Sequence, residues 1–476
     1  MKYKPKSLRM IKSNHILYAS FIVLACVTLF SGSVPFFWDG TFFSESACGM
    51  YTGSFGPFDF PENIDNVTFP VYSTYLCLAW KLFSKSLLVS HLAMLPFLLG
   101  ISYEFYKLAK KFLDDRFVSL ALILLLAEPT FMTQGLIMAY DIPLLYLFLL
   151  ALNLLLSERY TLYSIILPVI ALYSIRGLVL GLSLPAVHFF LLFPRHRYGA
   201  FLMVLRQHVL CIFVVAAWFM YHKSKTGWYL VSPLHEGTDE QLLSISMMLK
   251  QAMFITWKLI DFGRIALWLL LLAGMYIALR RNDESEKLRR LLLILFIPLA
   301  FTVLFMIPFS NPAGHRYFMF AFAILLIGAC YMLQEYMPQN WQKIIAATML
   351  IALLSGNCWM YPERFGNGWD SSLKVIPYFS LKEQMDEYIS GNNIDPASVG
   401  TQYPLIADKR FTHLSDVSFA YTNVWRGPLN NYTYFLQSNV INTDIPEQVE
   451  EVKKNWILVK KLESGQVYIS LYKNPG

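Results

Sequence analysis

The sequence contains few charged residues and few cysteines, and each shortage excludes a class of protein. Asp, Glu, Lys and Arg make up 15% of the 476 residues, whereas hydrophobic residues make up 56% and the mean hydropathy is +0.45. A chain of this composition does not fold in water alone, which excludes a soluble globular protein. The six cysteines show no CxxC spacing, so the sequence indicates neither a disulfide framework nor a zinc site.

The chain also lacks internal repeats and low-complexity tracts, and no inverted pair of broken helices is evident. Many transporters consist of two related halves, with broken helices that bind the substrate near the middle of the membrane. The absence of that pattern leaves a transporter as the secondary hypothesis.

What the chain does have is a series of apolar segments. Roughly 20 apolar residues are needed to cross a hydrocarbon layer of ~30 Å, and eleven segments qualify, some of them short. They are residues 16–37, 87–106, 117–132, 142–157, 162–175, 177–193, 209–221, 262–279, 291–307, 317–334 and 344–361. The predicted fold class is therefore a polytopic α-helical membrane protein, with the first segment as a retained anchor rather than a cleaved signal peptide.

Lys and Arg residues fix the predicted orientation, since positively charged loops remain cytoplasmic. They concentrate in residues 2–12, 107–116, 195–206 and 280–290, which places the N-terminus in the cytoplasm and the C-terminus outside. The net charge of +7 follows from this bias. No basic motif indicates a nucleic-acid partner.

We predict two domains. Residues 1–362 form the transmembrane domain, with long outer loops at 38–86 and 222–261, and residues 363–476 form a soluble α/β domain outside the membrane. The first loop is predicted to hold an interfacial helix over 71–83, and the second an amphipathic stretch over 241–257. The soluble domain is predicted to contain helices at 381–389 and 446–454 and a hairpin of 456–461 with 466–473.

Three carboxylates lie at predicted outer ends of spans: Asp39 and Glu45 in the run Trp38-Asp39-Gly40-Thr41-Phe42-Phe43-Ser44-Glu45, and Asp141. Placing a carboxylate at the membrane surface costs little free energy, whereas placing one at the bilayer centre costs ~3 kcal/mol or more. Such residues either mark helix ends that face water or act on a substrate. Asp141 is predicted to cap a helix with Pro143 in its first turn.

Three arginines lie at the same outer level, namely Arg176, Arg264 and Arg316. Positive charge on the outside opposes the topology rule, so each arginine needs a reason. Paired guanidinium donors are well suited to a phosphate. The alternatives are contacts with lipid headgroups, or ion pairs with Asp261 or Asp141.

The order of these motifs over roughly residues 14–330 resembles the GT-C superfamily of integral membrane glycosyltransferases, and within it the group of protein O-mannosyltransferases and aminoarabinose transferases. Asp39, Phe43 and Glu45 are similar to the acidic motif after the first span, although Gly40 replaces its second acidic residue. Further similar runs are Phe69-Pro70-Val71-Tyr72, Trp80-Lys81-Leu82-Phe83, Tyr140-Asp141-Ile142-Pro143-Leu144, Arg176-Gly177 and His315-Arg316-Tyr317.

The resemblance implies an outward-facing cavity. A polyprenyl-phosphate sugar donor enters from the membrane, and a lipid, glycan or protein acceptor enters from the aqueous side. In that scheme Asp39 is the base that takes the acceptor proton, Glu45 is a further catalytic candidate, and Asp141 orients an arginine or the acceptor. Candidates for the donor phosphate are Arg176, Arg264, Arg316, His315 and Tyr317. Direct displacement inverts the anomeric carbon.

The remaining candidates lie in the outer loops. Acceptor or loop contacts are expected from Trp38, Tyr72, Trp228, Tyr229, His235 and Glu236. Asp39, His235, Glu236 and Asp239 carry the donor atoms that a divalent ion needs, but their spacing matches no known ligand pattern. We therefore expect neither a metal nor another cofactor.

The leading hypothesis is an inverting glycosyltransferase that uses a lipid-phosphate donor and acts at the periplasmic face of a bacterial inner membrane. A transporter or flippase for a lipid-linked or anionic substrate is the alternative from another class. A scaffold that docks through the C-terminal domain would leave the charged outer loops without a role. Fold alone fixes neither the sugar nor the acceptor.

Overall fold

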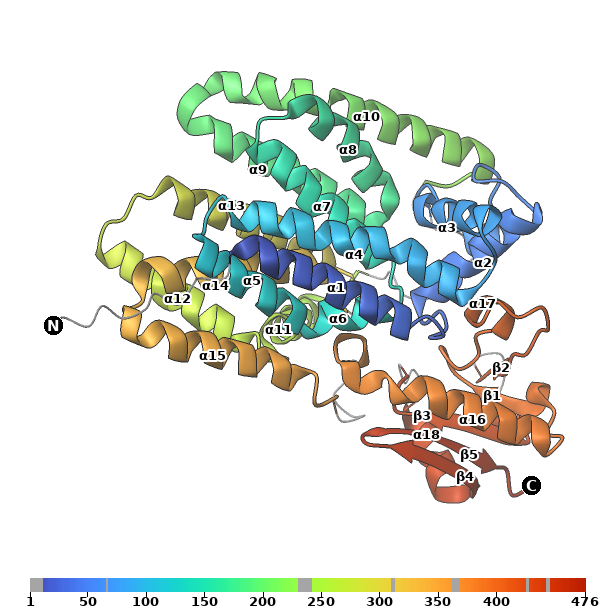
Figure 1. Ribbon diagram of the computed structural model, residues 1–476. Helices are drawn as coiled ribbons and strands as arrows, with labels where there is room; N and C mark the ends of the chain where they lie inside the picture. Colours follow the sequence, from blue (N-terminus) through green and yellow to red (C-terminus); the bar gives the residue numbers. More distant parts are fainter. Residues whose placement is uncertain are drawn as a thin grey trace.

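The structure is a computed structural model and describes residues 12–65, 67–229, 242–309, 313–361, 368–424, 428–441 and 446–476. A large helical bundle makes up most of the chain, and a smaller domain with a β-sheet lies at one end of it (Figure 1). This is the polytopic helical architecture with a small C-terminal α/β domain that the sequence predicts.

Six helices of the described chain are long and apolar enough to cross a membrane. They are α1 (Ser13–Phe30), α4 (Leu87–Ala109), α9 (Ile175–His196), α10 (Tyr198–Thr226), α13 (Glu286–Met306) and α14 (Met319–Tyr336). Two bent pairs raise the number to eight if each pair is one span. These are α5 (Asp115–Ala127) with α6 (Pro129–Leu136), bent by 55°, and α11 (Ile245–Ile260) with α12 (Ile265–Arg280), bent by 93°.

The eleven predicted segments each overlap a helix, but the structure does not support all eleven as full spans. The helices α7 (Asp141–Leu156) and α8 (Tyr160–Tyr173) are apolar but shorter, and α15 (Gln339–Gly356) does not meet the same criteria of length and composition. The prediction also extended the first segment to residue 37, whereas α1 ends at Phe30. Hydropathy located the helices correctly, and by length and composition six of the described helices, or eight with the two bent pairs, qualify as spans.

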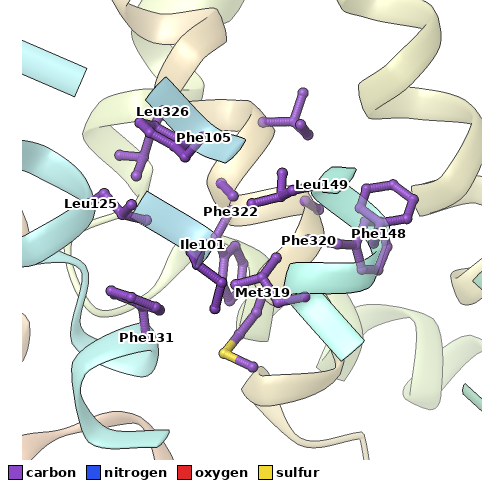
Figure 2. Close-up of a cluster of buried hydrophobic side chains, with 14 of the residues drawn as sticks. Ile101, Phe105, Leu125, Phe131, Phe148, Leu149, Met319, Phe320, Phe322 and Leu326 are labelled. Atoms are coloured by element: carbon purple, nitrogen blue, oxygen red, sulfur yellow. The ribbon is translucent and has the colours of Figure 1, made fainter. Parts of the chain in front are cut away.

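The bundle core forms around α14, of which 89% is buried in the most apolar window. A helix that is apolar on all sides belongs inside a bundle, and Phe320 and Phe322 of α14 contact neighbours on several sides (Figure 2). The labelled neighbours are Ile101 and Phe105 of α4, Leu125 of α5, Phe131 of α6, and Phe148 and Leu149 of α7. This core fixes the positions of α6, α7 and α14 relative to one another.

The first outer loop is largely helical. It contains α2 (Asp39–Thr52), the short helix η1 (Glu62–Ile64) and α3 (Val71–Leu82), the last of which matches the predicted helix over 71–83. Trp80 of α3 is fully buried and donates a hydrogen bond to Ser90 of α4 at 2.9 Å. In the second loop, α11 corresponds to the predicted amphipathic stretch.

The C-terminal domain contains a five-stranded sheet of order β2-β1-β3-β5-β4, in which β1 is parallel to β2 and β3 and the other pairs are antiparallel. Its strands are β1 (Val399–Thr401), β2 (Thr422–Asn423), β3 (Tyr434–Ser438), β4 (Ile457–Ser464) and β5 (Val467–Lys473). Its helices are η5 (Trp369–Ser371), η6 (Leu373–Val375), α16 (Pro377–Gly391), η7 (Pro396–Ser398), α17 (Lys409–Thr412), η9 (Leu429–Asn431) and α18 (Pro446–Asn455).

The two long helices of this domain cover opposite faces of the sheet. Leu436 of β3 belongs to the apolar cluster of α16, whereas the adjacent Phe435 belongs to that of α18, as expected because successive strand side chains point to opposite faces. The predicted helices 381–389 and 446–454 and the predicted hairpin are all present. The strands β1, β2 and β3 were not predicted.

The C-terminal domain packs tightly on one end of the bundle. Phe37, Ile137 and Ala139 share an apolar cluster with residues of α16 and the sheet. The rings of Trp38 and Trp369 lie 4.4 Å apart, centroid to centroid. The described part of the C-terminal domain therefore closes over the residues that surround Asp39.

The sharp turn between α11 and α12 yields a test of the fold. Gly263 has φ +85°, and a Cβ atom there would lie 1.9 Å from the carbonyl oxygen of Ala352. Left-handed backbone costs a non-glycine residue ~1–2 kcal/mol, and the clash with α15 adds to that cost. We expect Gly263→Ala to lower the free energy of unfolding by ~3 kcal/mol or more, measured as a lower thermal midpoint in detergent.

Gly227→Ala is the matched control. Gly227 also has φ +85°, but nothing lies within 4 Å of the position that a Cβ atom would take there. In this variant the free energy of unfolding should fall only by the cost of the left-handed backbone conformation. Equal midpoints for the two variants would contradict the close approach of Gly263 to α15.

Candidate active site

Four charged side chains from four separate elements meet at the end of the bundle that carries the C-terminal domain. Asp39 is the first residue of α2, Asp141 the first residue of α7, Arg176 the second residue of α9, and Arg316 lies in η3 (His315–Phe318). We call these four residues the charged quartet. Both carboxylates lie at helix N-termini, where the partial positive charge of the helix stabilises an anion.

Positive and negative groups alternate within the quartet. Arg316 Nη2 lies 2.7 Å from Asp39 Oδ2, and Arg176 Nη1 lies 2.7 Å from Asp141 Oδ1. The remaining two distances are 3.6 Å, from Arg176 Nη2 to Asp39 Oδ2 and from Arg316 Nε to Asp141 Oδ2. Each carboxylate thus faces both arginines, and the formal charges of the four groups sum to zero.

The members of the quartet differ in exposure. The Asp141 side chain is 3% exposed and that of Arg316 is 6% exposed, whereas Asp39 and Arg176 are 26% and 20% exposed. Asp141 and Arg316 therefore form the inner part of the site. Asp39 and Arg176 form the part that a substrate can reach.

Two tyrosines hold the plane of Arg176. The centre of its guanidinium lies 4.5 Å from the ring of Tyr140 and 4.1 Å from the ring of Tyr317. Tyr173 donates a hydrogen bond to the backbone oxygen of Tyr140 at 2.7 Å, which keeps that ring in place. Such cation–π contacts preserve the orientation of the guanidinium.

A narrow cavity of about 30 Å³ adjoins the quartet. Its polar end consists of Asp141, Arg176, Arg316 and Tyr317. Its walls are mostly apolar and come from α7, α9, α13 and α14: Leu144, Leu145, Val179, Leu180, Thr302, Phe305, Met306, Met319 and Phe320. Charge at one end and apolar side chains along the rest are the features of a site for an amphiphile.

Arg264 was predicted to bind the donor phosphate, but the structure places it elsewhere. It is fully buried and pairs with Glu128 and with Thr130, and its Nη1 lies 3.3 Å from Asp261 Oδ1. Its guanidinium centre lies 3.8 Å from the ring of Phe322. The alternative of pairing with Asp261 is thus observed, together with a second partner, Glu128, that was not predicted.

His315 connects this buried network to the C-terminal domain. Its Nε2 lies 2.7 Å from Asp261 Oδ2, and its Nδ1 lies 3.6 Å from Asp370 Oδ1. The backbone oxygen of Asp370 accepts a hydrogen bond from Gln134 of α6 at 2.6 Å. Because His315 precedes Arg316, the network directly adjoins the charged quartet.

The other predicted site residues do not all gather at the quartet. Glu45 lies farther along α2 and lines a separate groove with Tyr403 and Asp408. Trp38 packs on Trp369 and Tyr403, and the buried Tyr72 contacts Phe43. Trp228 is buried against His222, whereas Tyr229 is exposed beside Lys223. His235, Glu236 and Asp239 lie outside the described residues.

Asp141 does not act as the predicted helix cap. It is the first helical residue, its carboxylate is turned to the two arginines, and Tyr140 stands at the cap position without a capping side-chain hydrogen bond. Pro143 does lie in the first turn. Within the described residues, no three or more His, Cys, Asp or Glu side chains gather in a way that could hold a metal ion, and metal independence stays a prediction.

Sequence reasoning missed Tyr140, Glu128 and Asp370. Tyr140 directly precedes Asp141, so its position beside a predicted site residue was a signal that could have identified it. Glu128 lies between two apolar stretches in the middle of a predicted span, and a carboxylate there needs a partner. Asp370 carries no local signal, since its role depends on packing between distant parts of the chain.

Comparison with known proteins identifies the fold. No protein-family model and no curated protein matches this sequence. The crystal structure of ArnT from Cupriavidus metallidurans in the apo state matches 96% of this chain and 98% of its own, with a TM-score of 0.52 and 14% sequence identity. The chain has an ArnT-like fold. This confirms the polytopic GT-C-like fold that the motifs predicted, and at this identity the likeness concerns the fold.

Asp370 yields a pH prediction for the ArnT-like fold. Burial opposes its ionisation, but its interaction with His315 and the charges of Arg316 and Lys258 hold the pKa of Asp370 at about 2, below its ordinary value of 3.8. Such a group stabilises the folded state above its unfolded pKa, and that stabilisation disappears as the pH falls through the folded pKa. The shift corresponds to about 2 kcal/mol.

We expect Asp370→Asn to lower the free energy of unfolding at pH 7, and the difference from wild type to shrink between about pH 4 and pH 2. Intrinsic fluorescence during thermal unfolding in detergent measures both. Asp416→Asn is the control, because the Asp416 side chain is 98% exposed. A difference from wild type that stays constant with pH would contradict the ion pairing of Asp370.

Proposed function

We propose that the protein is an inverting glycosyltransferase that moves a sugar from a polyprenyl-phosphate donor to an acceptor at the periplasmic face of a bacterial inner membrane. The observation that carries the proposal is the charged quartet beside an apolar cavity. It combines an accessible carboxylate, two fixed guanidinium groups and a surface suited to a lipid chain.

Asp39 is the proposed general base. It is the more exposed carboxylate of the quartet, and two arginines lie within 3.6 Å of its Oδ2. In the reaction, Asp39 takes the proton of the acceptor hydroxyl while the acceptor oxygen attacks the anomeric carbon. The role requires access to the acceptor, which Asp141 at 3% exposure lacks.

Arg176 and Arg316 are the proposed phosphate ligands. As the bond between the anomeric carbon and the phosphate oxygen breaks, its electron pair remains on the phosphate, and fixed cations stabilise the developing charge. Asp141 faces both arginines and holds them in position. The two tyrosines beside Arg176 limit its motion further.

The apolar walls of the cavity suit the prenyl chain of the donor. Phe305 and Met306 close the cavity beside Tyr317, and Phe305 is 45% exposed. At about 30 Å³ the cavity is too small for a sugar and a prenyl chain. Donor binding therefore requires these side chains to move.

A single displacement accounts for inversion. A retaining mechanism requires a second carboxylate as nucleophile at the anomeric carbon. Within the described residues, the second carboxylate of the quartet is Asp141, which is buried between two arginines. Its ion pairs leave it poorly placed for nucleophilic attack.

A transporter or flippase remains the alternative function. Transporters commonly bind substrates near the bilayer midplane on broken helices. Here the quartet lies at the N-terminal ends of α2, α7 and α9 and in η3, under the C-terminal domain. This position supports chemistry at the outer face more than passage through the membrane.

The first test is release of free polyprenyl phosphate from a panel of polyprenyl-phosphate sugars by the purified protein. Loss of the base in Asp39→Asn should reduce release by about 10²-fold or more, with an unchanged thermal midpoint. Asp59→Asn serves as the control, since Asp59 is 69% exposed and pairs with Lys225.

Each result of this test has a definite meaning. Release by wild type and Asp59→Asn but not by Asp39→Asn supports the transferase and identifies the sugar. If wild type consumes no donor while labelled lipid crosses the membrane of proteoliposomes, the transferase is wrong and the transporter replaces it.

The arginines give a second test. Arg176→Gln should lower kcat/KM for the donor by about 10²-fold, because it removes a charge that stabilises the leaving phosphate. Arg176→Lys should retain more activity, since it keeps the charge and loses the paired donors. Arg280→Gln, far from the site in sequence and at the end of α12, should match wild type. Full activity in Arg176→Gln would remove this residue from the phosphate site.

A further inference from the structure

A large groove lies between α2 and the C-terminal domain, apart from the small cavity at the quartet. Its volume is about 470 Å³. We call it the α2 groove; it is lined by Thr41, Phe42, Glu45, Tyr403, Ile406, Ala407, Asp408, Phe411 and Asn423. Pockets of ~300–1,000 Å³ commonly hold small organic ligands, so a short oligosaccharide fits this groove.

The groove is connected to the proposed base through α2. Residues three apart on a helix are neighbours on its surface. Phe42 lies three residues after Asp39, or about 4.5 Å along the helix axis, and Glu45 lies three residues after Phe42. Phe42 therefore lies between Glu45 and the carboxylate that would take the proton of a ligand in the groove.

Tyr403 connects the other wall of the groove to the quartet. Its hydroxyl donates a hydrogen bond to the backbone oxygen of Trp38, the residue before Asp39. Burial, together with the negative charge of Asp39, raises the pKa of the Tyr403 phenol far above its ordinary value. The hydroxyl therefore stays protonated, and Tyr403 contributes a neutral side chain in a fixed position next to the site.

The aromatic side chains of the groove suit a sugar ring. Phe42 and Tyr403 lie nearly parallel, with centroids 5.5 Å apart and an angle of 14° between the rings. Phe42 is 45% exposed. A pyranose has an apolar face of C–H groups, and burying that face against an exposed aromatic ring removes apolar surface of both from water.

The polar side chains of the groove select for hydroxyl groups. Asp408 is already engaged, since it accepts hydrogen bonds from the backbone of Arg410 and Phe419 and from Ser418. Glu45 makes no side-chain hydrogen bond within the described residues, and burial raises its pKa. A half-buried carboxylate with open acceptor positions is satisfied by sugar hydroxyl groups.

The charge of the groove disfavours an anionic ligand. Arg410 Nη2 lies 2.8 Å from Asp408 Oδ2, and its charge also acts on Glu45. One arginine thus faces two carboxylates, and the three groups carry a net formal charge of −1. A phosphate brought beside Glu45 meets a like charge in a partly desolvated place, which is unfavourable. A neutral ligand avoids this repulsion.

We propose that the α2 groove is the acceptor site and that it binds the terminal sugars of a neutral, hydroxyl-rich glycan. The inference rests on the proposed glycosyltransferase function for its acceptor role. The C-terminal domain then has a defined function, because it supplies the wall that includes Tyr403, Ile406 and Asn423.

Saturation-transfer NMR on the full-length protein tests the binding. The probes are maltotetraose, mannotetraose and chitotetraose, with inorganic pyrophosphate as the anionic comparison. The detergent is a polyoxyethylene ether, because the headgroup of a maltoside would compete for the groove. We expect at least one tetrasaccharide to bind, and Phe42→Ala and Glu45→Gln each to weaken it tenfold or more.

The control variants carry the same chemical changes outside the groove. Phe83→Ala removes a phenyl ring that is 78% exposed, and Glu62→Gln neutralises an exposed carboxylate of the first outer loop. Both should bind the tetrasaccharide as wild type does. Thermal midpoints of all four variants establish that a lost signal is not lost folding.

The outcomes separate this inference from the proposed function. Tetrasaccharide binding that depends on Phe42 and Glu45, with donor release that depends on Asp39, supports both. Donor release without binding of any tetrasaccharide, or with stronger binding of pyrophosphate, overturns the glycan acceptor and keeps the transferase. Binding in the groove without consumption of any donor overturns the transferase and the acceptor role together.

Discussion

The site depends on the pairing of Asp141 with Arg176 and Arg316 in a place that water scarcely reaches. A buried charge is costly unless opposite charges and hydrogen bonds surround it. Asp141, at 3% exposure, faces two guanidinium groups from different elements, which supply the opposite charge. The same arginines also reach Asp39. One carboxylate on α7 thereby sets the positions of α2, α9 and η3 relative to one another.

A second buried network extends this arrangement to the C-terminal domain. Glu128, Arg264, Asp261, His315 and Asp370 form a chain of polar side-chain contacts from the start of α6 to η5. Its last member belongs to the C-terminal domain, whose aromatic residues also pack around Trp38. That domain is therefore structurally part of the site and cannot be removed without exposing paired charges.

Much of the fold follows from local sequence patterns. Apolar segments located the helices of the bundle, and alternation with turn residues located the β4–β5 hairpin, because both patterns depend on neighbouring residues. All four quartet residues stood out in the sequence: Asp39 and Asp141 as carboxylates at predicted span ends, and Arg176 and Arg316 as positive charges that oppose the topology rule. The sequence could not assign Arg264 to its buried ion pair, because its partner Glu128 is 136 positions away. It also could not separate Glu45 from Asp39. Both residues occur in one short motif, and only the packing of the C-terminal domain places them in different sites.

The neutrality of the quartet has a consequence for turnover. In the proposed reaction, Asp39 becomes neutral when it takes the acceptor proton, so the four groups then carry a net charge of +1 while the new phosphate is present. When Asp39 loses that proton to water, the net charge returns to zero and the attraction for the phosphate weakens. Release of the spent lipid is then coupled to one deprotonation, and the site is reset by the same carboxylate that began the cycle.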